Sequence, residues 1–235
     1  MERIRGHVKS RRPYDSSRRR EQARETRDAI LEAARRRFLA DGFAPTTIAA
    51  IAADVGVSVD TIYKSFGGKP GLVREICARA LAGEGPVPAE TRSDALHVTH
   101  HDPRDIIRGW GALTTEVAPR VAPVLLLIRD AAAGDAEMAS LLAEMEDQRL
   151  ERMTHNADAL ANAGHLRDGV SVEQAGEILW TYSSPQLYEL LVIIRGWPLE
   201  RYGTFLADAM IAALLRSEQT PPGSRRRASA NRRQP

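Results

Sequence analysis

Helical periodicity, broken repeatedly at glycine, is the feature that most limits what this chain can fold into. Apolar residues recur at the spacing of one buried helix face, as in Ile30, Leu31, Ala34 and Phe38, and no window alternates as a half-buried β-strand does. We therefore predict an all-α protein of about nine helices. The expected helices cover residues 17–40, 46–55, 58–66, 70–83, 103–118, 119–132, 135–162, 171–195 and 198–216.

Composition excludes several classes of protein. Apolar residues make up 43% and charged residues 27% of the 235 residues, which is ordinary for a globular protein and argues against global disorder. The longest apolar run of interest, 124–128, is far shorter than the roughly 20 residues of a membrane span. The single cysteine, Cys77, cannot form an internal disulfide. We expect a cytoplasmic protein without a membrane anchor.

Basic residues gather at the two ends of the chain, although the formal net charge is only +2. Residues 1–27 hold ten Lys and Arg against four Asp and Glu, and residues 216–235 hold six against one. The middle, 81–215, holds ten against twenty. We predict disordered basic arms at 1–17 and 217–235, which favour a polyanionic partner such as nucleic acid. Because 30 of the 33 basic residues are arginine, biased codon usage is an alternative explanation.

The segment 46–69 predicts two short helices joined by a tight turn at Gly56. Small alanines would let the two helices cross closely, and Val57, Ile62 and Phe66 would bury one side of the second helix. A second helix that presents short polar groups and a tyrosine outward can enter the DNA major groove, which is about 12 Å wide. The segment therefore predicts a helix-turn-helix, although any small helical bundle can contain such a turn.

Residues 22–83 resemble the N-terminal DNA-binding domain of the TetR family of transcriptional regulators. The residues that carry the resemblance are 27–34, Phe38, 42–43, 46–48, 51–52, 56–58, 61–63, Phe66, Lys69 and Leu72. Residues 188–215, with the motifs at 195–197 and 201–202, look like the last two helices of a TetR-type regulatory domain. The resemblance implies a helix-turn-helix domain at 18–83 and a helical regulatory and dimerisation domain at 84–216. It implies a repressor that binds a palindromic operator as a homodimer and is released by a small molecule.

The same resemblance implies which residues meet DNA. They are Thr46, Thr47, Ser58, Val59, Asp60, Thr61, Tyr63, Lys64 and Lys69. Among them Tyr63 and Lys64 would touch phosphates, and Lys69 would favour an anion at the start of the fourth helix. Asp60 is a departure, because a carboxylate repels phosphates, yet it can accept from cytosine N4. Capping of its own helix by Asp60 is the alternative.

The C-terminal domain carries two further predictions. The resemblance implies a dimer interface on the last two helices, at Leu187, Leu191, Ile194, Leu206, Met210 and Leu214. A ligand cavity between helices would be lined by Trp110, Leu113, Val117, Met138, Leu141, Met145, Trp180, Tyr182 and Ser183. Ordinary core packing is the alternative for both sets. The acidic middle of the chain favours a neutral or cationic ligand.

Two other functions compete with a regulator. An enzyme or metal protein would draw on His97, His100, His101 and Asp102, but we read 83–102 as a Gly/Pro/Thr-rich linker without a scaffold to fix metal geometry. We therefore predict no metal, no cofactor and no catalytic residues. A sequence-nonspecific architectural DNA-binding protein that uses both basic arms is the second alternative.

Overall fold

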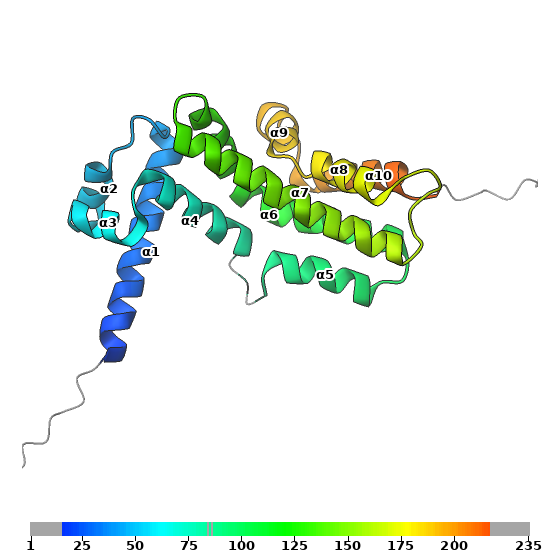
Figure 1. Cartoon of the computed structure of the whole chain (residues 1–235), viewed down its shortest axis with the longest axis horizontal. Coiled ribbons are helices and arrows are strands. Elements are labelled where there is room, and N and C mark those ends of the chain that lie inside the picture. The colour runs from blue at the N-terminus through cyan, green and yellow to red at the C-terminus, as the bar shows by residue number, and fades with distance from the viewer. Residues whose placement is uncertain (1–15, 84, 86, 217–235) are drawn as a thin grey trace, which may run out of the picture.

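The computed structural model describes residues 16–83, 85 and 87–216, which form helices without a β-strand (Figure 1). The N-terminal helices are α1 (Ser16–Asp41), α2 (Ile48–Val55), α3 (Val59–Phe66) and α4 (Lys69–Ala82). They are followed by α5 (Ala89–Thr99), α6 (Pro103–Ala132), α7 (Ala136–Asn162), α8 (Val172–Tyr182), α9 (Pro185–Tyr188), the π-helical turn η1 (Glu189–Ile194) and α10 (Leu199–Leu214). Within these residues nine helices have eight or more residues, so the all-α prediction is confirmed.

The basic arms predicted at 1–17 and 217–235 lie outside the described residues, except that residues 16 and 17 open α1. The helix therefore begins inside the predicted N-terminal arm. In Figure 1, α1 projects well beyond α2 and α3, and every residue from 17 to 25 is exposed.

The linker predicted at 83–102 is wrong, because it contains the helix α5. The buried side chains of α5 are Ala89 and Ser93, and Leu96 packs beside them against the core. These buried residues are small and few, so the apolar periodicity of the helix is weak in the sequence. Gly, Pro and Thr around it then dominate the local pattern.

The two helices predicted at 103–118 and 119–132 are one helix, α6, which continues through Pro119 and Pro123. Each proline removes one backbone hydrogen bond, yet α6 buries a long face that includes Val121 and Val124. Tertiary packing outweighs the local penalty here. The helix predicted at 171–195 is instead divided into α8, α9 and η1.

Helix α6 is also long and apolar enough to cross a membrane, by length and composition alone, which the sequence analysis did not anticipate. In the fold it lies at the centre of the helical body and packs against α4, α5, α7, α9 and α10. It carries Arg104, Arg108, Arg120 and Arg129 along its length. Packing on so many sides is what the core helix of a globular domain requires.

The buried side chains form two clusters. The first joins α1–α4 to α6 and α7, and includes Phe38, Leu72, Ile128, Met138 and Leu141. The second joins α6, α7, α8, α9 and α10. The N-terminal helices therefore share a core with the C-terminal part of α6 and the start of α7.

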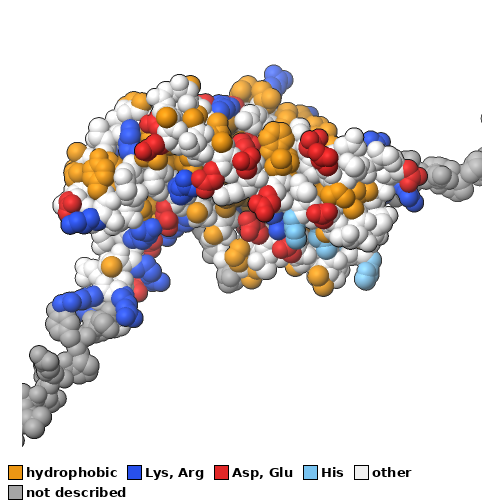
Figure 2. Space-filling view, in the orientation of Figure 1, with side chains coloured by type: hydrophobic (Ala, Val, Ile, Leu, Met, Phe, Trp, Pro, Cys, Tyr) orange, Lys and Arg blue, Asp and Glu red, His pale blue; other side chains and the backbone are white. Residues whose placement is uncertain are grey.

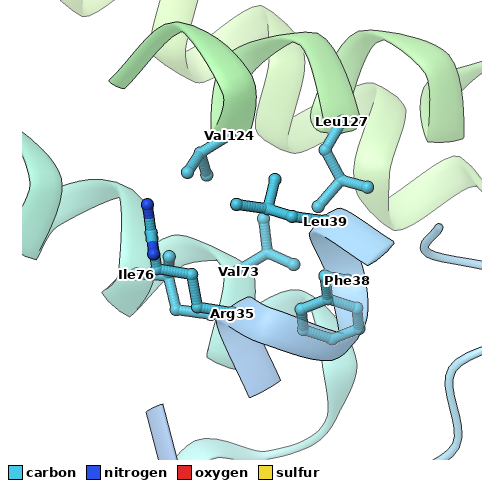
Figure 3. A pocket seen from close by; sticks show the side chains of 7 residues that line it. All are labelled: Arg35, Phe38, Leu39, Val73, Ile76, Val124 and Leu127. Atoms are coloured by element: carbon cyan, nitrogen blue, oxygen red, sulfur yellow. The ribbon is translucent and has the colours of Figure 1, made fainter. Parts of the chain in front are cut away.

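Figure 3 shows the junction between these parts from close by. Leu39 of α1 and Val73 of α4 lie beneath Val124 and Leu127 of α6, and the gap among them has no room for a water molecule. Such close contact transmits small movements rather than absorbing them. The C-terminal part of α6 is thus in direct contact with α1 and α4.

Candidate nucleic-acid interface and ligand cavity

Local capping builds the helix-turn-helix formed by α2 and α3. The Thr47 hydroxyl accepts a hydrogen bond from the Ala50 amide at 3.1 Å and starts α2. Gly56, at φ 74°, ends α2 in the left-handed conformation that favours glycine. The Ser58 hydroxyl then accepts from the Thr61 amide at 3.1 Å and starts α3. Three short-range signals thus define the turn.

Packing on both sides sets the orientation of α3. Ile51 of α2 and Ile62 of α3 are fully buried against each other's helices and the rest of the first core. At the end of α3, the guanidinium carbon of Arg27 lies 4.4 Å from the centre of the Phe66 ring. The same guanidinium pairs with Glu75 of α4 at 3.0 Å. Helices α1 and α4 therefore hold α3 in place from behind.

The outward face of α3 is open to solvent. Tyr63 is 52% exposed and Val59 is 40% exposed. Asp60 and Lys64, one turn apart, form an ion pair with 2.7 Å between Oδ2 and Nζ. Because Ser58 caps the helix, Asp60 is not the cap that the alternative interpretation required. Its carboxylate instead offsets the charge of Lys64 on the outward face.

Thr46 and Lys69 are held inside the domain, apart from the outward face of α3. Thr46 is 2% exposed and its hydroxyl donates to the Gly42 carbonyl at 2.7 Å. The half-buried Lys69 donates to the carbonyls of Phe43 at 2.7 Å and Ala44 at 3.3 Å, and its Nζ lies 4.3 Å from the Phe43 ring centre. Both side chains therefore tie down the loop between α1 and α2.

Basic side chains line the projecting end of α1, while acidic side chains are spread over the body of the molecule on the face seen in Figure 2. The described part of this end contains Arg18, Arg19, Arg20 and Arg24, with Glu21 bonded to Arg24 at 2.6 Å. The basic residues that are concentrated near the N-terminus of the sequence are thus also concentrated in one region of the structure. Positive charge lies beside the helix-turn-helix.

A cavity of about 260 Å³ lies among α4–α10. Six of the nine residues predicted to line a ligand site do line it: Trp110, Leu113, Val117, Met145, Tyr182 and Ser183. Met138 and Leu141 do not, because they belong to the first core at 0% and 1% exposure. Trp180 is not in the lining either, and its ring lies against Arg149, 4.5 Å from the guanidinium carbon.

Several lining residues were missed by the sequence analysis, among them Arg149, Arg152, Tyr188 and Tyr202. Burial raises the pKa of both tyrosines, that of Tyr202 to about 12, so their hydroxyls stay protonated at neutral pH. No sequence pattern pointed to the two arginines, because this chain is rich in arginine throughout.

The comparisons with known proteins agree with this geometry. Residues 30–76 match the family model of the bacterial regulatory proteins, tetR family. Over 197 residues the chain is 27% identical to the HTH-type transcriptional repressor BepR of Brucella suis biovar 1 (strain 1330), covering 82% of this chain and 93% of that protein. The chain belongs to the TetR family. It is a DNA-binding transcriptional regulator, as the sequence analysis expected.

Solved structures show the same fold as this TetR-family chain. NalD, the secondary repressor of the MexAB-OprM multidrug efflux pump in Pseudomonas aeruginosa, has a TM-score of 0.65 at 20% identity, covering 84% of this chain and all of that one. SmeT, in a complex with triclosan, has a TM-score of 0.64 at 21% identity, covering 82% of this chain and 92% of that one. At these identities the likenesses establish the shared fold.

The apolar stripe predicted as a dimer face on α10 belongs to the TetR-family chain's own core. Leu206, Met210 and Leu214 are 1%, 5% and 0% exposed, so a second chain cannot reach them. Of the other predicted residues, Leu187 and Leu191 are half-buried and Ile194 is 65% exposed. Other exposed apolar side chains of this C-terminal region are Leu190 and Ile193 on η1 and Leu199 and Phe205 on α10.

The remaining candidates are the side chains considered for metal binding or catalysis, namely the histidines and the single cysteine. Within the described ranges, no group of three or more His, Cys, Asp or Glu side chains is placed to hold a metal ion. His97 packs edge-on against Trp110, with 5.3 Å between ring centres, and burial lowers its pKa. His155 lies 3.4 Å from Asp94. Cys77 is fully buried, and burial raises the pKa of its thiol to about 11.

Proposed function

We propose that this TetR-family regulator is a repressor that binds a near-palindromic operator as a homodimer and releases it when a small molecule fills the cavity. The observation that carries the proposal is the rigidly backed, exposed face of α3. Its proposed DNA-contacting residues are Ser58, Val59, Asp60, Thr61, Tyr63 and Lys64, with Thr47 at the start of α2. Two such helices about 34–36 Å apart would read adjacent major grooves.

Exposed apolar side chains on η1 and α10 support the proposal that the protein binds DNA as a homodimer. Leu190, Ile193, Ile194 and Phe205 are between 39% and 65% exposed and lie on η1 and α10. A cluster of large apolar side chains in water is unfavourable unless a partner covers it. A second copy of this chain, docked on this surface, would bury it and set the distance between the two α3 helices.

Helix α4 connects the cavity to the DNA-binding helices. Its first residue, Lys69, ties down the α1–α2 loop, and Leu81 in its last turn lines the cavity. Arg74 of α4 is bonded to Glu144 of α7, and Arg120 of α6 donates to the Ala80 carbonyl at 3.4 Å. A ligand that spreads the cavity would therefore displace α4. A coupling of about 1–3 kcal/mol would change operator affinity roughly 5- to 150-fold.

The test of operator recognition begins with selection of bound fragments from a genomic DNA pool, followed by gel-shift titration. We expect one near-palindromic site. Tyr63→Phe, which removes only the hydroxyl, should weaken binding to that site and to unrelated DNA by a similar factor, because phosphate contacts carry no base information. A sequence-nonspecific architectural protein would bind many unrelated fragments, and an enzyme that does not bind DNA would retain no fragment.

The test of the dimer surface compares two charge insertions. Ile193 on η1 is 56% exposed and Val98 on α5 is 82% exposed. Ile193→Glu should convert the dimer to a monomer in analytical ultracentrifugation and abolish operator binding. Val98→Glu, the matched control, should do neither. If Ile193→Glu leaves both the sedimentation and the operator affinity intact, this surface is not the interface.

Two further expectations follow from the family. A regulator of this kind needs no catalytic residue or cofactor, and we propose none. We expect the protein in the cytoplasm, where its operator DNA lies.

A further inference from the structure

A half-buried cation, Arg149, lies at the wall of the cavity. Arg149 of α7 lines it, and its side chain is only 13% exposed. Its Nη1 donates to the Trp180 carbonyl and, at 3.0 Å, to the Ser183 hydroxyl, and its Nη2 donates to the Glu146 carboxylate. The Nε–H is buried and has no hydrogen-bond partner among the described residues. One donor of a buried guanidinium is thus unsatisfied.

A second unsatisfied donor belongs to the same lining. Trp110 of α6 is 6% exposed, and its indole N–H is buried without a partner among the described residues. Among the described residues, the two fully buried polar side-chain atoms of the cavity lining that have no partner are both donors, Arg149 Nε and Trp110 Nε1. A buried donor needs an acceptor. The lining therefore lacks a hydrogen-bond acceptor for these two donors, which an oxygen atom of a bound ligand would supply.

The charges around the cavity favour an anionic acceptor over a neutral one. Arg152, the other arginine in the lining, donates from Nη2 to Asp94 at 2.6 Å and to Asn156 at 3.0 Å. Glu90 is the only acidic residue among the lining residues, and it is exposed. For Arg149, burial lowers the pKa although the Glu146 carboxylate raises it, because desolvation disfavours the charged guanidinium. A further negative charge would be attracted there and a cation repelled.

We propose that the cavity binds an apolar molecule with a single acidic head group, a carboxylate or a similar oxyanion, which accepts a hydrogen bond from Arg149. The rest of the lining suits the apolar part, with Leu113, Val117, Met145 and Leu206. This inference rests on the proposed function in taking the cavity as the effector site. It reverses the preference for a neutral or cationic ligand that the acidic composition suggested, because the acidic side chains lie mainly outside the cavity.

The test uses three probes with the same apolar chain and different head groups: decanoate, decanol and decylammonium. Each is titrated into the full-length protein below its micelle concentration, with tryptophan fluorescence as the readout, since Trp110 lines the cavity and Trp180 lies against Arg149. We expect decanoate to bind at least about tenfold more tightly than either of the others. Equal affinities, a preference for the ammonium, or no binding of any probe would overturn the proposal.

Three variants assign the preference to Arg149. Arg149→Met should abolish it, but this change also removes the bonds to Trp180 and Ser183 and could unfold the domain. Glu146→Gln keeps those bonds and removes the competing carboxylate, so it should increase the preference for decanoate. Arg108→Met, the matched control, removes an arginine that pairs with Asp105 outside the cavity lining, and should leave the preference intact. A preference that does not change in Glu146→Gln, or that Arg108→Met removes, would contradict the assignment.

Operator binding, measured on the same samples, separates this inference from the proposed function. If decanoate binds through Arg149 but leaves operator affinity unchanged, the head-group inference stands and ligand-controlled release fails. If a probe without the acid binds more tightly and releases DNA, the release mechanism stands and the head-group inference fails.

Discussion

Replacing Gly71 by alanine would force apart α3 and α4, which meet behind the proposed DNA-binding face. Gly71 lies in the first turn of α4, directly against the end of α3. A Cβ atom on Gly71 would lie 1.7 Å from the carbonyl oxygen of Phe66 and 2.9 Å from its carbonyl carbon. Since both obstructing atoms are backbone, no rotamer change can relieve the clash.

The size of the effect follows from this distance. Ordinary Cβ contacts begin at 3.4 Å, so the contact must open from 1.7 to at least 3.4 Å. Overpacking of a close contact costs about 1–3 kcal/mol or more. For a chain of this size each kcal/mol lowers the melting temperature by about 2–4 °C, so Gly71→Ala should melt about 2–12 °C below the wild type. Operator affinity should fall too, because Phe66 is the last residue of α3.

Far-UV circular dichroism gives the melting temperature, and gel-shift titration gives the affinity. Gly134→Ala is the matched control, because a Cβ atom there would have no neighbour within 4 Å and its φ is not left-handed. It should leave stability unchanged or raise it by up to about 1 kcal/mol, by restricting the unfolded chain. If Gly71→Ala has the same melting temperature as the wild type and binds the operator equally well, the contact between α3 and α4 does not hold α3 in place.

Three further predictions concern single groups. The Cys77 thiol, whose pKa burial raises to about 11, should react with Ellman's reagent at pH 8 only as fast as the protein unfolds, and rapid labelling of the native protein would contradict its burial. The Glu116 carboxyl, whose pKa Arg92 lowers to about 2, contributes stability above its ordinary pKa of 4.5 that is lost as the pH falls from 4.5 towards 2. In urea titrations Glu116→Gln should therefore flatten the acid side of the stability profile, and an unchanged profile would show that the pair adds nothing. Thr47→Ala removes the cap of α2 and should cost about 1 kcal/mol in the same assay, while no loss would mean that water replaces the hydroxyl.

Features set by short stretches of chain could be predicted from the sequence. Ser58 starts α3 and Gly56 ends α2 because each acts on backbone groups within one turn of itself. The exposed face of α3 followed from the same reasoning, since an eight-residue helix with Ile62 and Phe66 on one side has only one side left for solvent. The bounds of these two helices and the exposed side of α3 were therefore determined locally.

The regulatory half was determined by tertiary packing. Periodicity identifies the apolar side of a helix but not what covers it, so Leu206 and Ile193 look alike in sequence, although one is buried in its own chain and the other is 56% exposed. Likewise, an arginine in an arginine-rich chain carries no signal of its own. Arg149 becomes distinctive only where α7 and the end of α8 enclose it, since burial removes the water that would otherwise satisfy its Nε–H.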